Sequence, residues 1–198
     1  MVIRGQDVGK KELRVWETVS RKTVLKHNQF LTVESHTVRL PDGKIIPDWA
    51  WLVIPSAAII LAVTENNYYL CFRQTKYAVA GTTLAPVGGM LEPDETPIKA
   101  AKRELLEETG YEATDWVNLG SYILDPNRGI ATMHLFLALN AKRVAEPNSD
   151  DLEDQELLLL SRDEIENALK DGEFKILAWS AVVAIALNYL DSDGNSRT

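Results

Sequence analysis

The sequence has one cysteine, no long apolar run and no excess of positive charge among its 198 residues. Cys71 alone cannot form an intramolecular disulfide, which is typical of proteins in a reducing compartment. Because Cys71 lies in the apolar run YYLCF, we expect a buried and unreactive thiol. The 21 Lys and Arg residues against 29 Asp and Glu residues give a net charge of −8, which disfavours sequence-independent binding to nucleic acid.

Neither end of the sequence has the composition of an export or membrane segment. Residues 1–16 lack the apolar core of a signal peptide. The run ILAWSAVVAIALNYL near the C-terminus is apolar over fifteen residues only, fewer than a membrane-spanning helix needs. We therefore expect a cytoplasmic protein with no membrane partner, in which this run forms a core or subunit-interface helix.

The order of apolar patterns predicts many strands, one central helix, more strands and two late helices. Runs at 56–63 and 68–74 are typical of strands buried on both faces, joined by a hairpin at Asn66–Asn67. Residues 78–91 are rich in glycine and predict a loop. Further strands are expected at 12–20, 23–27, 30–40, 45–54, 116–124, 132–139 and 156–160, and late helices at 161–172 and 176–190.

This order of elements indicates an α+β fold with a mixed sheet between helices. We expect residues 1–54 to form a separate antiparallel β region that mediates dimerisation. Residues 55–190 would form the main domain, and the polar residues 191–198 a disordered tail.

The clearest predicted helix runs from Pro97 to Thr109, with Thr96 as its N-cap and Gly110 just after its end. Apolar residues at helical spacing predict its buried stripe, which consists of Ile98, Ala101 and Leu105.

Three carboxylates, those of Glu104, Glu107 and Glu108, fall within one turn at the edge of this stripe. Like charges four residues apart on a helix cost a few tenths of a kcal/mol, and half-buried carboxylates raise one another's proton affinity unless a cation lies among them. Mg²⁺ prefers such oxygen ligands. The alternative is a solvated helix face, in which the basic residues of KRELLEE pair with the glutamates.

The residues around this turn favour the metal-binding interpretation. Two glycines, Gly88 and Gly89, precede the helix and allow a close approach of the backbone. Gly89 is followed after five residues by Glu95, and after seven more by RELLEETGY. This spacing resembles the signature of the Nudix hydrolases, with Tyr111 looser than the usual aliphatic residue. The matching residues are Gly89, Glu95, Arg103, Glu104, Leu105, Glu107, Glu108, Gly110 and Tyr111.

Segments outside the signature are similar to ADP-ribose and nucleotide-sugar pyrophosphatases of that family, over about residues 14–190; among them are FRQTKY, LAPVGGML and LSRDEIENALKDGEF. The resemblance implies a Nudix-type α/β/α sandwich with an added N-terminal antiparallel β subdomain, and a homodimer. It also implies hydrolysis of a nucleoside diphosphate sugar to a nucleoside monophosphate and a sugar phosphate, with Mg²⁺ or Mn²⁺. The alternatives are another nucleoside diphosphate derivative as substrate, or a weakly catalytic domain that binds a nucleotide sugar as a sensor.

The same resemblance implies roles for individual residues. Glu95 and Arg103 would pair and brace the loop that contains Gly89 against the helix. The residues expected to hold the metal and to act in catalysis are Glu104, Glu107 and Glu108, with the carbonyl of Gly88 as a further metal ligand.

Four other residues are candidates for substrate binding. Arg73 and Lys76 could contact phosphate or ribose oxygens, or could be ordinary strand-end charges. Trp51, with Trp49 beside it, could stack on a base, although a packing pair within the sheet is favoured. Arg128 could hold a phosphate or a sugar acid.

One loop departs from the pattern of the ADP-ribose-hydrolysing relatives, which place a glutamate before the strand HLF. Here the loop reads DPNRGIATMHLF, with Ala131 at that position. The attacking water would then be activated by Glu107, Glu153, Glu156 or metal alone. We therefore expect ADP-ribose to be a poor substrate, and an Ala131→Glu replacement to improve it. His134 in this strand is expected to be a packed, hydrogen-bonded residue.

Overall fold

The computed structural model describes residues 13–148 and 154–194, which form two compact units. Among these residues, unit 1 comprises 13–54 together with Asn127–Gly129, and unit 2 comprises Pro55–Pro126, 130–148 and 154–194. Glu153, one of the predicted candidates for the catalytic base, lies outside the described residues.

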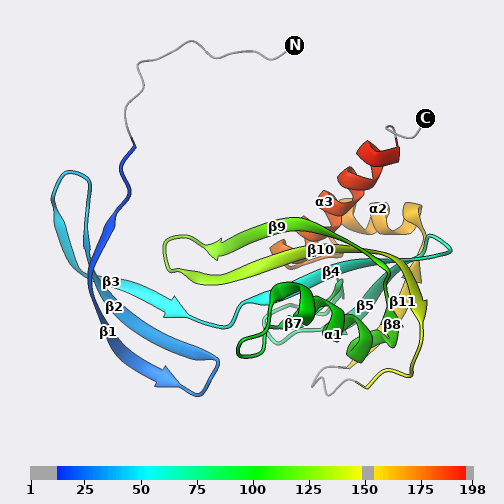
Figure 1. Cartoon of the computed structure of the whole chain (residues 1–198), viewed down its shortest axis with the longest axis horizontal. Coiled ribbons are helices and arrows are strands. Elements are labelled where there is room, and N and C mark those ends of the chain that lie inside the picture. Colours follow the sequence, from blue (N-terminus) through cyan, green and yellow to red (C-terminus); the bar gives the residue numbers. More distant parts are fainter. Residues whose placement is uncertain (1–12, 149–153, 195–198) are drawn as a thin grey trace, which may run out of the picture. The chain divides into compact units, whose positions relative to one another are not determined.

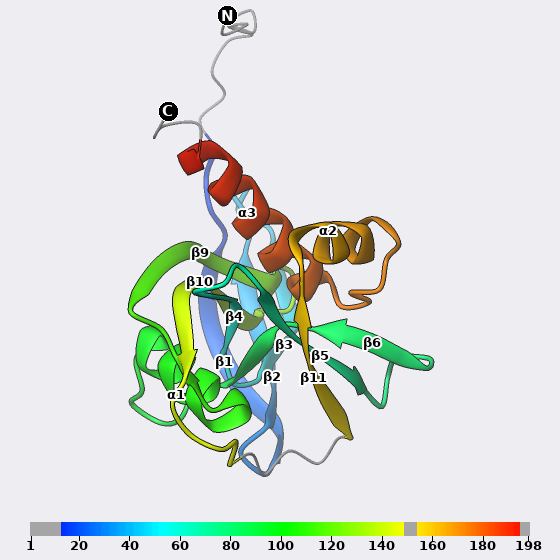
Figure 2. The same ribbon diagram turned by 90° about the vertical axis from the view of Figure 1, so that its right-hand side faces the viewer.

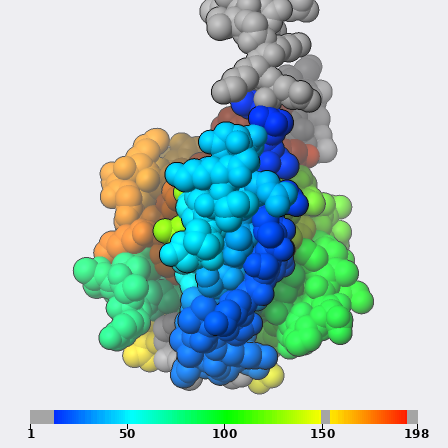
Figure 3. Space-filling view, turned by 90° about the vertical axis from the view of Figure 1, so that its left-hand side faces the viewer, coloured from blue at the N-terminus to red at the C-terminus, as the bar shows by residue number. Residues whose placement is uncertain are grey.

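Unit 1 is built on a three-stranded antiparallel sheet (Figure 1). Its strands, in spatial order, are β1 (Glu17–His27), β2 (Leu31–Arg39) and β3 (Ile45–Val53). The sequence predicts two strands where the single β1 is found. The polar residues 21–22 are predicted as a break between strands, but every residue of β1 is solvent-exposed, so polar residues fit there. Figure 3 shows the surface of this unit, on which blue and cyan residues lie side by side.

Unit 2 contains an eight-stranded mixed sheet. The order of its main path is β11-β5-β4-β10-β8, with β6 paired to β5, β7 to β4 and β9 to β10. Only the β4–β10 pair is parallel, among the residues that the structure describes. The strands are β4 (Ala57–Thr64), β5 (Tyr69–Thr75), β6 (Thr82–Ala85), β7 (Val87–Met90), β8 (Tyr111–Glu112), β9 (Asp115–Asp125), β10 (Ile130–Arg143) and β11 (Gln155–Leu160).

Helices cover both faces of this sheet (Figures 1 and 2). One face carries α1 (Pro97–Thr109), and the other carries α2 (Arg162–Lys170) and α3 (Leu177–Gly194). The alternation of β4 shows how the two cores form. Its residues Ala58, Ile60 and Ala62 pack with α1, whereas Ile59, Leu61 and Val63 pack with α2 and α3. This α/β/α arrangement confirms the predicted fold class.

The ends of the helices follow local sequence signals, with two differences. Pro97 opens α1 and Gly110 ends it at φ 73°, but the side chain of Thr96 makes no capping hydrogen bond. Ser161 and Glu164 form the predicted capping box of α2. Helix α3 continues to Gly194, so the first part of the predicted disordered tail is helical. Residues 195–198 of that tail lie outside the described residues.

The predicted loop at 78–91 is wrong in its second half, which contains β6 and β7. Strand β7 pairs with β4, so that Gly88 lies opposite Ile59 and Gly89 opposite Ala58. Glycine carries no strand pattern of its own, and it is the pairing with β4 that makes this segment extended. As a result, both glycines are held in the sheet beside α1.

Two expectations, one about the cysteine and one about membrane-spanning helices, can be compared directly with the structure. Cys71 in β5 is fully buried, as predicted, and this burial raises the pKa of its thiol to about 12. None of the helices within residues 13–148 and 154–194 is both long enough and apolar enough to span a membrane.

Candidate active site

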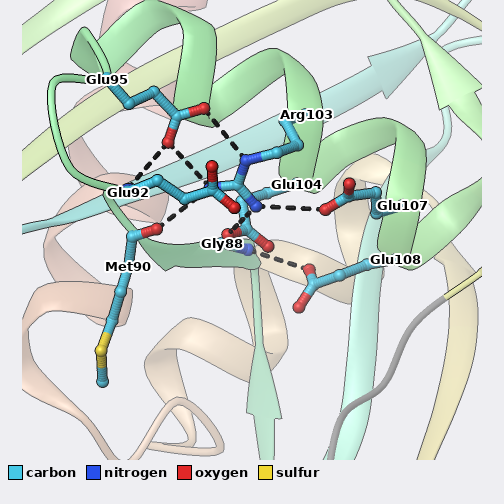
Figure 4. Close-up of polar contacts among 8 residues, drawn as sticks. All are labelled: Gly88, Met90, Glu92, Glu95, Arg103, Glu104, Glu107 and Glu108. Carbon is cyan, nitrogen blue, oxygen red and sulfur yellow. Dashed lines mark hydrogen bonds and ion pairs between the residues drawn. The ribbon is translucent and has the colours of Figure 1, made fainter.

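Arg103 on α1 joins the acidic turn of the helix to the loop before it (Figure 4). Its Nε and Nη2 atoms donate to the two oxygens of Glu95 at 3.0 and 2.9 Å. Its Nη1 atom donates to Glu104 Oε1 at 2.7 Å and to Glu107 Oε2 at 3.1 Å. Nη2 also reaches the carbonyl oxygen of Met90 at 3.1 Å. The structure thus contains the predicted Arg103–Glu95 ion pair and adds two further carboxylates to it.

The charges in this cluster stabilise one another. The hydrogen bond from Arg103 is the main cause that lowers the pKa of Glu95, and the backbone N–H of Glu92 adds to it. In turn, the hydrogen bond to Glu95 is the main cause that raises the pKa of Arg103. Both groups are therefore charged at neutral pH, and Arg103 is fixed between the helix and the loop. The contributions of Met90 and Glu92 come from backbone atoms, which leave no signal in the sequence.

The two glycines of β7 lie directly under the acidic turn. A Cβ atom on Gly89 would be 2.2 Å from Glu104 Oε1, so only glycine leaves room for this carboxylate. Gly88 has φ 155°, and a Cβ atom there would be 2.3 Å from the carbonyl oxygen of Ala58. Its N–H donates to Glu108 Oε2 at 3.1 Å. Glu104 and Glu108 thus lie against consecutive residues of β7.

These groups offer the type of ligand that a hard divalent ion prefers, because their donor atoms are carboxylate and backbone oxygens. The close approach of Glu104 to Gly89 also suits a metal ion, because it brings a carboxylate next to backbone atoms that no side chain covers. Arg103 holds Glu104 and Glu107. Over residues 13–148 and 154–194, no three His, Cys, Asp or Glu side chains converge as a metal site.

Comparison with known proteins places the chain in a family. Residues 53–180 match the family model for the NUDIX domain, and residues 16–52 match the model for the nucleoside diphosphate sugar hydrolase N-terminal domain. The first match covers more than half of the chain. The chain belongs to the Nudix family. This membership confirms the prediction of a Nudix hydrolase, a pyrophosphatase by class.

Relatives of this Nudix protein are named for different nucleotides. The chain is 28% identical over 178 residues to the ADP-ribose pyrophosphatase of Bacillus subtilis, covering 88% of this chain and 94% of the relative. It is 30% identical over 151 residues to the CMP-5'-(N-acetyl-N-hydroxy-3-aminopropyl)phosphonate hydrolase of Streptomyces rubellomurinus, covering 75% and 71% respectively. The crystal structure of an ADP compounds hydrolase shares the fold, with a TM-score of 0.77, 20% identity and coverage of 93% and 99%.

Two predicted candidates lie on the sheet face away from the Nudix helix α1. Arg73 in β5 lies on the same face of the strand as Cys71, which packs with α2 and α3. The Nη2 atom of Arg73 donates to Glu173 Oε2 at 3.1 Å. Glu156 pairs with Arg73 across the strands, and its neighbour Leu157 is the one that packs on the α1 side. This placement favours a structural ion pair for Arg73 over substrate binding. Lys76 follows the end of β5 and is half-buried.

Trp51 belongs to unit 1, where its ring contacts two other residues of that unit. The ring of His36 stacks on it with 5.0 Å between centroids and 20° between planes. Gly129 is so close that a Cβ atom would lie 1.9 Å from the Trp51 ring. These contacts favour the packing alternative over stacking on a base.

Trp49 and Arg128 also meet within unit 1. The Trp49 Nε1–H donates to the carbonyl oxygen of Asn127 at 2.8 Å. The Arg128 guanidinium carbon lies 5.4 Å from the Trp49 ring centroid, a cation–π contact. The structure thus gives Arg128 a partner in its own unit.

Ala131, the position of the missing loop glutamate, is 7% exposed and has φ 31°. A side chain longer than a methyl group would be buried there in a backbone conformation that favours glycine. This environment argues against the expected gain from Ala131→Glu, because the new carboxylate would need to leave the interior to act.

Proposed function

We propose that this Nudix protein is a divalent-cation-dependent pyrophosphohydrolase. Its substrate class is nucleoside diphosphate sugars, and its products are a nucleoside monophosphate and a sugar phosphate. The observation that carries the proposal is the position of Glu104 and Glu108 against the Gly88–Gly89 backbone. Two carboxylates approach a backbone without side chains there, which suits a cation that binds phosphates.

Each residue of the cluster has a role in this proposal. Glu104, Glu108 and the Gly88 carbonyl would hold Mg²⁺ or Mn²⁺, with Glu107 as a further ligand. The bound ion would screen the diphosphate charge and acidify the attacking water. Arg103 positions Glu104 and Glu107 through its Nη1 donors.

The substrate class is supported by the second family match, to the N-terminal domain of nucleoside diphosphate sugar hydrolases. The named relatives differ in base, adenine in one and cytosine in the other. Their common chemistry is a 5′-nucleotide joined through phosphorus to a second group. We therefore propose the diphosphate and its sugar as the recognised features and leave the base open.

We also propose that the protein acts in the cytoplasm as a homodimer through unit 1. Its β1 is exposed along its whole length and carries apolar residues such as Val24 (63% exposed) and Leu25 (51%). Apolar exposure of this kind is typical of an interface. Light scattering coupled to gel filtration should give twice the mass of one chain; a monomer at micromolar concentration would exclude the dimer.

The proposed activity is tested with a panel of nucleoside diphosphate sugars that differ in base and in sugar. Each is incubated with the protein and Mg²⁺, Mn²⁺ or EDTA, and released monophosphate is measured. We expect release with a metal and none with EDTA. Glu104→Gln and Glu108→Gln should each lower kcat by about 10²-fold or more, with the melting temperature preserved. Release that is insensitive to both EDTA and these variants would refute the metal site.

A further inference from the structure

One row of the unit 2 sheet places His134 on the same face as the acidic turn of α1. Gly89 of β7 pairs with Ala58 of β4. Ala58 also pairs with His134 of β10, which pairs in turn with Ser121 of β9. Phe136, two residues along β10, packs in the apolar cluster that contains the buried residues of α1. Because residues two apart in a strand share a face, His134 lies on the α1 face.

The residue between Gly89 and His134 in this row is small. Ala58 carries only a methyl group and is fully buried. Neighbouring strands lie about 4.8 Å apart, so about 10 Å of sheet separates the backbones of Gly89 and His134. Glu104 lies over Gly89. Two successive contacts of about 3 Å, from imidazole to water and from water to phosphorus, fit within that span.

The imidazole of His134 is oriented by Ser121. Ser121 Oγ and His134 Nδ1 are 2.8 Å apart. The structure describes no hydrogen bond at Nε2 within residues 13–148 and 154–194. When Nδ1–H donates to the hydroxyl, Nε2 carries the lone pair. Partial burial lowers the pKa of His134, so its neutral form predominates at pH 7.

Two of the other candidates for the base are engaged elsewhere, and Glu153 lies outside the described residues. Glu107 is bound by Arg103, and Glu156 belongs to the opposite face of the sheet. Ala131 has no ionisable group. The geometry points to His134 Nε2 as the general base that takes the proton of the attacking water, with Ser121 as its positioning residue. This inference rests on the proposed hydrolase activity and names the proton acceptor within it.

The step is a hydrolysis in which the water oxygen forms a bond to one phosphorus of the diphosphate. The bond from that phosphorus to the bridging oxygen breaks, and its electron pair leaves with the departing phosphate. Nε2 of His134 receives the proton that the water loses and later releases it to solvent. The net reaction consumes one water and yields two phosphorylated products.

The test measures kcat and KM of His134→Gln and His134→Ala on the best substrate of the wild-type panel. Loss of a general base should lower kcat by about 10²- to 10⁴-fold, with KM unchanged. Added imidazole should restore part of the kcat of His134→Ala and none of that of a Glu104→Gln control. His27→Gln, on the exposed strand β1 of unit 1, serves as the matched histidine control and should keep wild-type kcat.

Ser121 is tested by Ser121→Ala, which should lower kcat, and Ser121→Thr, which should retain it by keeping a hydroxyl. If the wild-type protein is active but His134→Gln keeps its kcat, the assignment of the base is wrong and the hydrolase proposal stands. A fall in kcat of His134→Ala that imidazole does not relieve also overturns it. If the wild-type protein releases no monophosphate from any substrate, the proposed function itself fails.

Discussion

Replacing Gly89 with alanine should damage the site and leave the fold nearly intact. The new Cβ atom would lie 2.2 Å from Glu104 Oε1, where ordinary contact begins at 3.4 Å, so the carboxylate must move by about 1 Å. The obstructed atoms are the end of a flexible side chain, so the free energy of unfolding should change by less than about 1 kcal/mol. A displacement of about 1 Å in a catalytic group can cost about 10² in rate, and we expect kcat to fall by that factor.

The assay combines monophosphate release with thermal unfolding for Gly89→Ala, Gly88→Ala and Gly172→Ala. In Gly88→Ala the obstacle is the backbone carbonyl of Ala58, which cannot move aside, so this variant should lose both stability and activity. Gly172 has open space around its Cα and φ 73°. Its variant should lose about 1 kcal/mol of stability and no activity. A Gly89→Ala variant with wild-type kcat would refute this prediction. It would also be refuted if Gly89→Ala lost as much stability as Gly88→Ala, because unfolding would then explain the loss of activity.

Three other predictions concern stability. The pKa of Glu95 is lowered from 4.5 in the folded protein, chiefly by Arg103. The stabilisation that ionised Glu95 gives to the folded protein is therefore complete above pH 4.5 and is lost as the pH falls through the lowered pKa. Glu95→Gln should for this reason flatten the decline in melting temperature below about pH 5. Gly129→Ala should destabilise unit 1 by about 1–3 kcal/mol, seen as an earlier change in tryptophan fluorescence, because it displaces Trp51; an unchanged transition would contradict that contact. Ala131→Gly should stabilise unit 2 by about 1 kcal/mol and Ala131→Glu should destabilise it without raising activity on ADP-ribose; a more active Ala131→Glu enzyme would contradict our interpretation of this position.

Local signals in the sequence predict the helices well because their causes lie within a few residues. Helix α1 begins at Pro97 and ends before Gly110, as predicted. Ser161 caps α2 by accepting a hydrogen bond from the backbone N–H of Glu164, three residues later. Strand β7 could not be predicted in this way. Its Gly88–Gly89 pair has no apolar alternation, and only hydrogen bonding to β4, remote in sequence, makes it a strand.

The same contrast applies to the site. The spacing from Gly89 to Glu108 brings the acidic cluster together because most of it is one helix and the loop before it. The face on which a strand residue lies depends on sheet pairing. Arg73 and Glu156 lie on the face of the sheet opposite α1, whereas His134, expected to be a packed residue, lies on the α1 face. The sequence pattern shows that side chains alternate between the two faces of a strand, but it does not show which of these faces packs against α1.

The structure also changes the physical reason for crowding the carboxylates. From sequence alone, the crowding of Glu104, Glu107 and Glu108 favours a bound metal ion, with pairing to basic residues of the same helix as the alternative. In the structure Arg103 already lies among them and bonds Glu95 as well. One guanidinium cannot neutralise four carboxylates, so the cluster keeps a net negative charge that would repel an anionic diphosphate. Close binding of such a substrate therefore requires more positive charge than this turn of the helix contains, and the oxygen donors beside Gly88 are where a divalent ion can add it.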